Sequence, residues 1–247
     1  MARLKFPHGF EPITKKLRGS QILERLKTLF EATREVLDEK TATESQEVFE
    51  KNSVDSYQNL LKHLASLNVL EDACTEVSIW LACCLANILG IISPNVPTGN
   101  MSTLKNVLLF FIRQLNGLSC TADKLYPRYL YLLECISAFS IFDLALELGD
   151  DTSYILKELI KTGFNAIKEK KEEDGRLVQS LIITQCSQLL QRIDQISNPV
   201  IDAIFYFLVP PQKFVNRESY RMARELIIKN QATLEPYIQM FLNHGIS

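Results

Sequence analysis

Glycine and proline are both scarce in this chain, which has nine of each among its 247 residues. Gly-rich phosphate loops, β folds with many hairpins and collagen-like repeats all depend on frequent glycine, so the composition disfavours these three classes. Histidine is limited to three residues, and His8, His63 and His244 do not lie at metal-ligand spacing from one another or from a cysteine. We therefore expect no metal site and no cofactor.

An excess of charge of one sign is also lacking, because 27 Lys and Arg residues face 29 Asp and Glu residues, for a formal net charge of −2. A generic nucleic-acid binder normally carries a clear basic excess. The basic cluster near the amino terminus, Lys15, Lys16 and Arg18, could touch phosphate or an acidic partner. Since Glu24 and Glu31 soon balance it, we interpret the cluster as a solvated entry to the first helix.

Long apolar runs are missing as well. The most apolar stretch, 79–92, is shorter than the ~20 residues that span a bilayer, and the first residues contain no apolar core of a signal peptide. No membrane association is therefore predicted. The six cysteines form no C-x-x-C pair, and most lie inside apolar helical runs, which is typical of a reduced, intracellular chain: Cys74, Cys83, Cys84, Cys120, Cys135 and Cys186.

Helical periodicity, by contrast, runs along almost the whole chain, and no convincing alternation predicts a strand. A polar stretch, 39–53, reads as a loop or a weak helix, and two prolines and a glycine interrupt the chain within 93–100. The apolar spacing predicts helices over about 20–38, 54–66, 75–91, 102–115, 127–136, 150–167, 176–193, 198–208, 216–229 and 233–242. The helix over 75–91 is apolar on nearly all sides, which predicts burial between neighbouring helices.

Taken in pairs, the predicted helices form hairpins that begin near Thr75, Pro127, Arg176 and Asn216, at intervals of 52, 49 and 40 residues. These intervals approach the about 40–47 residues of HEAT-type repeats. The sequence therefore predicts an all-α fold, specifically an α-solenoid of HEAT-like helical hairpins, with a compact all-α bundle as the alternative. We expect residues 1–19 to be an N-terminal extension and residues 20–247 to be the helical repeat domain.

Catalytic motifs are absent, since the sequence contains no G-x-x-x-x-G-K, G-x-S-x-G or G-x-G-x-x-G. Cys83 and Cys84 lie in a helix too apolar to activate a thiolate. The acidic pairs at 150–151 and 172–173 lie at helix boundaries, where caps and solvated turns explain them better than general acid–base chemistry does. An all-α enzyme would need a convergent polar pocket, which nothing in the sequence supplies. We expect that the protein is not an enzyme.

The proline loop, residues 93–97, is the feature with most potential for binding. Its two prolines are three residues apart and hold an extended backbone between two buried helices. A rigid loop on a helical scaffold is suited to docking a peptide. A simple connection between helices is the alternative, and the residues alone favour it.

In this loop and the helix before it, the sequence resembles the precocious-dissociation-of-sisters family of cohesin-associated HEAT-repeat proteins. Residues 77–97, VSIWLACCLANILGIISPNVP, are similar to that family's V-x-x-x-x-A-C-C-L-A-D-I helix and the A-P-(D/E)-A-P loop after it. Weaker similarities occur in order along nearly the whole chain, at 6–9, 22–29, 108–117, 128–134, 142–148, 209–210, 220–226 and 241–243.

This resemblance implies a regulator of sister-chromatid cohesion that acts as a non-enzymatic scaffold, is nuclear and associates with chromosomes. The implied partners are the cohesin complex (its kleisin and head subunits), the release factor Wapl, and the cohesin acetyltransferase or other antagonists, with chromatin contacted indirectly. Because family members are several times longer, the chain looks like their amino-terminal HEAT portion. A general HEAT-repeat adaptor in transport or another assembly is the alternative function.

By position, the family's peptide-docking loop corresponds here to Ser93, Pro94, Asn95, Val96 and Pro97. The resemblance implies that this loop docks short peptides of Wapl and of the antagonists that compete with it. Both prolines are kept, while the other three residues differ from the family pattern.

Positions beside the loop also depart from the family pattern. Gly90 stands where a basic residue is expected, and Ile92 and Thr98 stand where aromatic residues are expected. Losing one charge and two rings from a pocket rim removes on the order of a few kcal/mol from a binding hot spot. We therefore expect a loop of conserved shape with altered peptide specificity.

Overall fold

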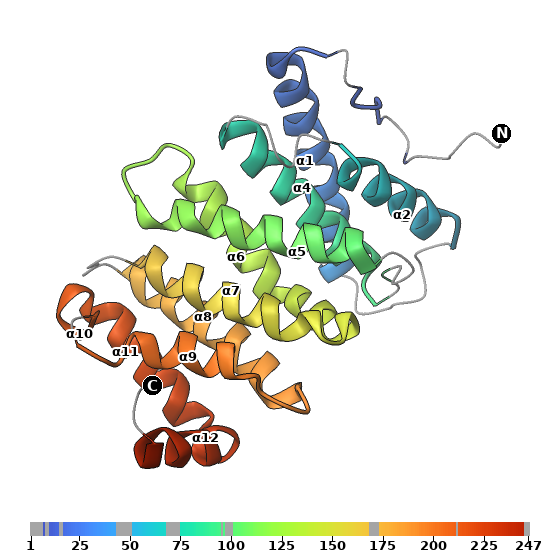
Figure 1. The fold of residues 1–247 in the computed structure, drawn as a ribbon. Helices are drawn as coiled ribbons and strands as arrows, with labels where there is room; N and C mark the ends of the chain where they lie inside the picture. The colour runs from blue at the N-terminus through green and yellow to red at the C-terminus, as the bar shows by residue number, and fades with distance from the viewer. Residues whose placement is uncertain are drawn as a thin grey trace.

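The computed structural model describes residues 7, 10–14, 17–42, 51–67, 75–94, 96, 101–167, 173–210 and 212–244. Every regular element in these ranges is a helix (Figure 1). The α-helices are α1 (Gly19–Ala42), α2 (Lys51–Ala65), α4 (Thr75–Ile92), α5 (Met101–Leu115), α6 (Tyr126–Ala138), α7 (Asp151–Ala166), α8 (Glu173–Arg192), α9 (Asn198–Tyr206), α10 (Gln212–Val215), α11 (Arg217–Lys229) and α12 (Gln231–His244). Two 3-10 helices, η2 (Asn116–Ser119) and η3 (Ile141–Leu148), complete the set.

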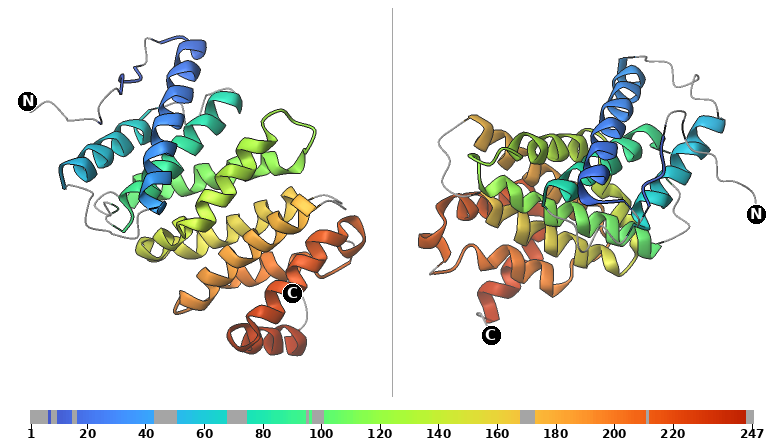
Figure 2. Two further views of the ribbon diagram at one scale, coloured as in Figure 1. Left: turned by 180° about the vertical axis from the view of Figure 1, so that it is seen from behind. Right: turned by 90° about the horizontal axis from the view of Figure 1, so that it is seen from above.

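The helices stack in two layers that advance along the chain (Figures 1 and 2). Helices α1, α4, α6, α8 and α11 contact one another in this order and form the first layer, while α5, α7 and α9 form the second. α2 packs against α4. Because each helix mainly contacts its counterpart in the next hairpin, the arrangement is a solenoid and not a closed bundle. The predicted fold class, an α-solenoid of HEAT-like hairpins, is confirmed.

The predicted helices all have counterparts, and the hairpins begin at Thr75, Tyr126, Glu173 and Arg217, within three residues of the predicted starts. Such differences are ordinary at helix ends, where the first and last turns lack part of their hydrogen bonding. The polar segment 39–53 falls largely on 43–50, outside the described residues. The short helices η2, η3 and α10 were not predicted. η2 and α10 have four residues each, too few to show a 3.6-residue period, and η3 is a 3-10 helix of eight residues, which has three residues per turn instead.

Helix α4 forms the centre of the amino-terminal half. Every residue from Val77 to Ile92 is buried, and α1, α2 and α6 all pack against this helix. A fully buried Leu, Ile or Val side chain contributes about 1.5–3 kcal/mol, so the burial of this one helix is a large part of the core energy. The prediction of a helix enclosed by neighbours is confirmed.

Buried polar side chains link neighbouring helices of the first layer. The Asn87 amide, with no exposed surface, donates to the Thr33 hydroxyl (3.1 Å) and accepts from the Tyr131 hydroxyl (2.8 Å), joining α4 to α1 and α6. Later helices are joined in the same way, by Gln185 donating to Ser137 at 3.4 Å and Asn230 donating to Ser187 at 2.9 Å. Each bond fixes the register of one helix against the next, because a buried polar group left without a partner is costly.

The segment before α1 also lies on this scaffold. Ile13 is only 1% exposed, and the Arg25 side chain holds the segment by donating to the Pro12 carbonyl oxygen and pairing with Glu11. In the predicted basic cluster, Arg18 is exposed, while Lys15 and Lys16 lie outside the described residues.

Membrane-spanning potential can be judged for the described part of the chain. No single helix there is long and apolar enough to cross a bilayer, and α6 with η3 meets the criterion only as a pair, bent by 63°.

Candidate functional site

The proline loop begins where α4 ends, at the edge of the solenoid along which first-layer helices turn toward the second layer (Figure 1). Ser93 is half-buried, and Pro94 is exposed and follows a cis peptide bond. Val96 is half-buried and packs against the hydrophobic core. Asn95 and Pro97 lie outside the described residues. The described part of the loop is therefore an exposed proline between two residues that contact the scaffold.

Lys40, at the end of α1, is a residue of this site that sequence reasoning missed. Its ammonium donates to three backbone carbonyl oxygens, those of Gly90 (2.9 Å), Ile91 (2.8 Å) and Ser93 (2.7 Å). An ammonium has three N–H donors, so all of them are used here. Partial burial lowers the pKa of Lys40 below its ordinary value, because removal from water disfavours the charged form.

The position of Lys40 follows from the chemistry of a helix end. The last carbonyl groups of α4 have no helical N–H partner, and they carry the negative end of the helix dipole. Pro94, four residues after Gly90, has no N–H to donate to the Gly90 oxygen. The Lys40 ammonium supplies the missing donor and a compensating positive charge. The Gly90–Pro94 spacing indicates from the sequence that the Gly90 carbonyl lacks its helical donor. The spacing does not indicate which residue supplies a donor in its place.

Beside the loop, Gly90 and Ile92 are both enclosed by neighbouring side chains. A Cβ atom on Gly90 would lie 2.9 Å from the Phe139 ring and 3.0 Å from a Leu37 methyl group, so neighbouring side chains occupy the space around position 90. Ile92 is 1% exposed and belongs to the core. The third position, Thr98, lies outside the described residues. Residues 90 and 92 thus pack in the interior of the last turn of α4, directly before the loop.

A second cluster on the first layer combines cations with aromatic rings. The Arg128 guanidinium lies 4.3 Å from the centre of the Trp80 ring and 4.8 Å from that of Phe30, and Lys27 lies 5.4 Å from Trp80 while pairing with Glu76 at 3.0 Å. Stacking of this kind is worth about 0.5–2 kcal/mol and covers the rings from water. The cluster stabilises the contact of α1, α4 and α6.

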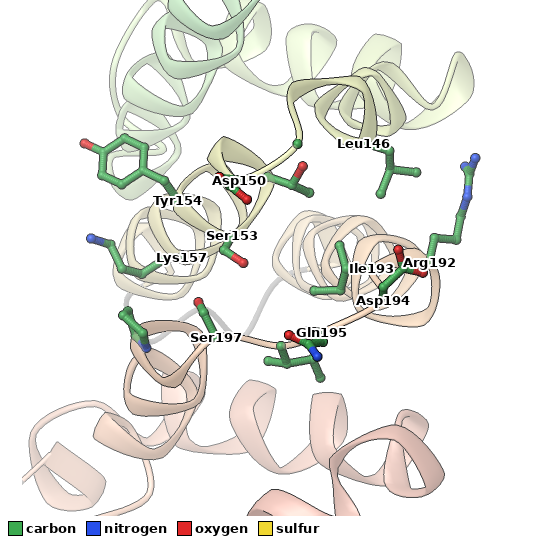
Figure 3. A pocket seen from close by; sticks show the side chains of 14 residues that line it. Leu146, Asp150, Ser153, Tyr154, Lys157, Arg192, Ile193, Asp194, Gln195 and Ser197 are labelled. Carbon is green, nitrogen blue, oxygen red and sulfur yellow. The ribbon is translucent and has the colours of Figure 1, made fainter.

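A cleft of about 740 Å³ opens further along the same edge, between the first turns of α7 and the connection from α8 to α9 (Figure 3). Its cations are already paired, Lys157 with Glu158 and Arg192 with Asp143. Asp150 and Ser197 also line it, at the starts of α7 and α9. The residues that line the cleft are polar and of both charges, and they do not favour one class of ligand.

His63 and the buried cysteines are packing residues. Within the described ranges, no three His, Cys, Asp or Glu side chains come together as ligands for a metal ion. His63 packs edge-on against Phe10 with ring centres 6.0 Å apart, and burial lowers its pKa. Burial raises the pKa of the Cys83, Cys84 and Cys186 thiols, and raises that of Cys135 to about 11, which disfavours the thiolate form in each.

The fold and this edge define a helical-repeat scaffold, a class of protein that presents loops on a stack of paired helices. The sequence model of the family described as sister chromatid cohesion protein PDS5 matches residues 20–247. The chain therefore belongs to the PDS5 family, and the family resemblance found in the sequence is confirmed.

Similar proteins agree with this assignment. The chain is 29% identical over 241 residues to PDS5 homolog B-A of Xenopus laevis and to PDS5 homolog A of Homo sapiens, which covers 98% of the chain and 16% and 17% of these relatives. A solved structure of the Pds5-Scc1 complex has the same fold, with a TM-score of 0.67 and 20% identity over 91% of this chain and 32% of that one. The chain thus spans about a sixth of the length of these curated relatives.

Proposed function

We propose that this chain is part of a regulator of sister-chromatid cohesion, a non-enzymatic scaffold that docks short peptides at the proline loop. The peptides would come from the release factor Wapl and from antagonists that compete with it. The observation that carries the proposal is the family match across 20–247, which includes α4 and the loop after it. The mechanism would be competition between these peptides, with an anchoring residue of the peptide entering a groove between adjacent helices.

The loop geometry supports this proposal. Pro94 is exposed at the edge of the scaffold, while the carbonyl groups just before it are held by Lys40. A loop held in one conformation loses little entropy when a ligand binds, which raises the affinity. Ser93, Pro94, Asn95, Val96 and Pro97 remain our candidate partner-binding residues.

For the organisation of the chain, we propose that residues 20–247 form one HEAT-like repeat domain, the amino-terminal part of a longer protein, and that 1–19 form an N-terminal extension. The proposed partners are the cohesin complex, through its kleisin and head subunits, then Wapl and the cohesin acetyltransferase or other antagonists. The fold shared with the Pds5-Scc1 complex supports the kleisin part of this set. We propose a nuclear, chromosome-associated protein that contacts chromatin indirectly, through cohesin.

Calorimetric titration with the amino-terminal segment of Wapl from the same organism tests the docking proposal. We expect the unmodified chain to bind, and the double variant Pro94→Ala, Pro97→Ala to bind at least about tenfold more weakly, because the loop loses its pre-organisation. The matched control is Pro127→Ala with Pro210→Ala, which removes two exposed prolines away from the loop. Circular dichroism checks that both double variants keep their helicity.

Two results would contradict the proposal. Absence of binding by the unmodified chain would exclude Wapl peptides as ligands of this region. Equal loss of affinity in the loop variant and in the control variant would mean that the effect does not come from the loop.

A further inference from the structure

We infer that Lys40 is a positioning residue of the proline loop: from α1 it holds the last turn of α4 and thereby sets the backbone from which the loop departs. The inference deepens the proposed function, on which its consequence for peptide binding rests. Lys40 lies 53 residues before Ser93 in the sequence, so the contact exists only because α1 and α4 pack side by side.

The contact with the end of α4 uses the whole hydrogen-bonding capacity of the Lys40 ammonium. Its three donors reach three different carbonyl oxygens at 2.7–2.9 Å, which are short distances for charge-assisted hydrogen bonds. Among the described residues, no carboxylate lies within ion-pair distance of Lys40, and Asp38, two residues earlier in α1, pairs with Arg34. The carbonyl groups of the α4 terminus are therefore its partners, and the stem of the side chain spans the gap between the two helices.

The end of α4 lacks one of its helical hydrogen-bond donors. Pro94 cannot continue the helix, and it leaves the Gly90 oxygen without its helical donor. Ser93 is bonded on both sides, since its N–H donates to the Leu89 oxygen at 3.0 Å and its own oxygen accepts from Lys40. Without the ammonium, the Gly90, Ile91 and Ser93 oxygens would need water as a partner at a half-buried site. The residue immediately before Pro94 would then lose its tether to α1.

The cation at the end of α4 comes from α1. Gly90 has no side chain of its own and is packed against Leu37 and Phe139, so position 90 supplies no charge. Lys40 provides the cation across the contact of α1 with α4. Because all three of its donors are used, Lys40 acts on a bound peptide through the loop backbone and not by direct contact.

The test uses the whole chain and two independent readouts. Lys40→Met keeps the length of the stem and removes the ammonium, and Lys40→Gln keeps two N–H donors without charge. Lys161→Met, on the exposed face of α7, is the matched control. Amide hydrogen exchange at Ser93, whose N–H donates to the Leu89 oxygen, is measured without peptide and tests whether Lys40 holds the end of α4. Titration with the Wapl segment tests peptide binding.

In Lys40→Met we expect exchange at Ser93 to rise about tenfold or more and the peptide to bind about tenfold more weakly, with intermediate values for Lys40→Gln and no change for Lys161→Met. Should Lys40→Met lose helicity, Lys40→Gln carries the comparison. Unchanged exchange in a folded Lys40 variant would overturn the positioning role. Raised exchange at Ser93 with unchanged affinity for the Wapl segment would overturn the inference that Lys40 affects peptide binding. Absence of binding by the unmodified chain would overturn the proposed function, while the exchange data still decide the role of Lys40.

Discussion

Asn87 shows how much one side chain can determine in this scaffold. Its amide is fully buried and satisfies groups on two other helices, the Thr33 hydroxyl of α1 and the Tyr131 hydroxyl of α6. The Thr33 hydroxyl in turn donates to backbone carbonyl oxygens one turn earlier in α1. A chain of hydrogen bonds thus crosses three helices at one level of the first layer.

We expect Asn87→Ala to lower the free energy of unfolding by about 1–3 kcal/mol, because it leaves buried polar groups without partners and opens a small cavity. Urea denaturation followed by circular dichroism measures the change. The control Asn106→Ala, at an exposed position of α5, should change stability by no more than about 0.5 kcal/mol. Equal effects of the two substitutions would show that the Asn87 bonds contribute nothing beyond helix propensity.

At the contacts between helices, close packing depends on glycine, which has no side chain. The connection from α5 to α6 passes through η2, where a Cβ atom on Gly117 would lie 2.3 Å from the Tyr129 ring. Tyr129 is itself only 2% exposed, so its ring has little space to move. The absence of a side chain at 117 therefore lets the start of α6 pack directly against the turn before it.

Gly117→Ala should consequently destabilise the chain by about 1–3 kcal/mol, the usual cost of overpacking a well-filled core. Gly19→Ala is the matched control, since a Cβ atom at Gly19 would have no heavy atom within 4 Å. Thermal denaturation of both variants gives the comparison. A Gly117→Ala variant as stable as the control would mean that the Tyr129 ring readily finds another position.

For the whole molecule, the two-layer stack means that stability arises mainly between successive hairpins. The first layer contains separate polar bridges, at Asn87 between early helices and at Asn230 between late ones. In a stack of this kind, each interface contributes its own free energy, and distant interfaces have no shared partners.

We expect the losses caused by Asn87→Ala and Asn230→Ala to add within about 0.5 kcal/mol when combined. The contrasting pair is Thr33→Val with Asn87→Ala, whose hydrogen-bonded side chains should show a coupling of about 0.5–3 kcal/mol. Denaturant titrations of the single and double variants measure both values. A strong coupling between Asn87 and Asn230 would show that the first layer behaves as one cooperative unit.

The sequence alone determined which longer segments are helical, where the hairpins begin and that α4 is buried, because these properties follow from periodicity and composition, which are local along the chain. The sequence also contains the motif over 77–97 that carries the family resemblance. It also predicted the proline loop as an interruption after α4. The candidate site could be located this way because two prolines are a strong local signal.

Only the tertiary structure decided which residues support that loop. Lys40 meets the carbonyl groups of Gly90 and Ser93 across 50 to 53 residues of sequence, and Phe139 closes the space at Gly90. Both contacts depend on how α1, α4 and α6 are placed against one another. No local pattern encodes that placement, because it results from the packing of whole helix faces, in which many side chains act together.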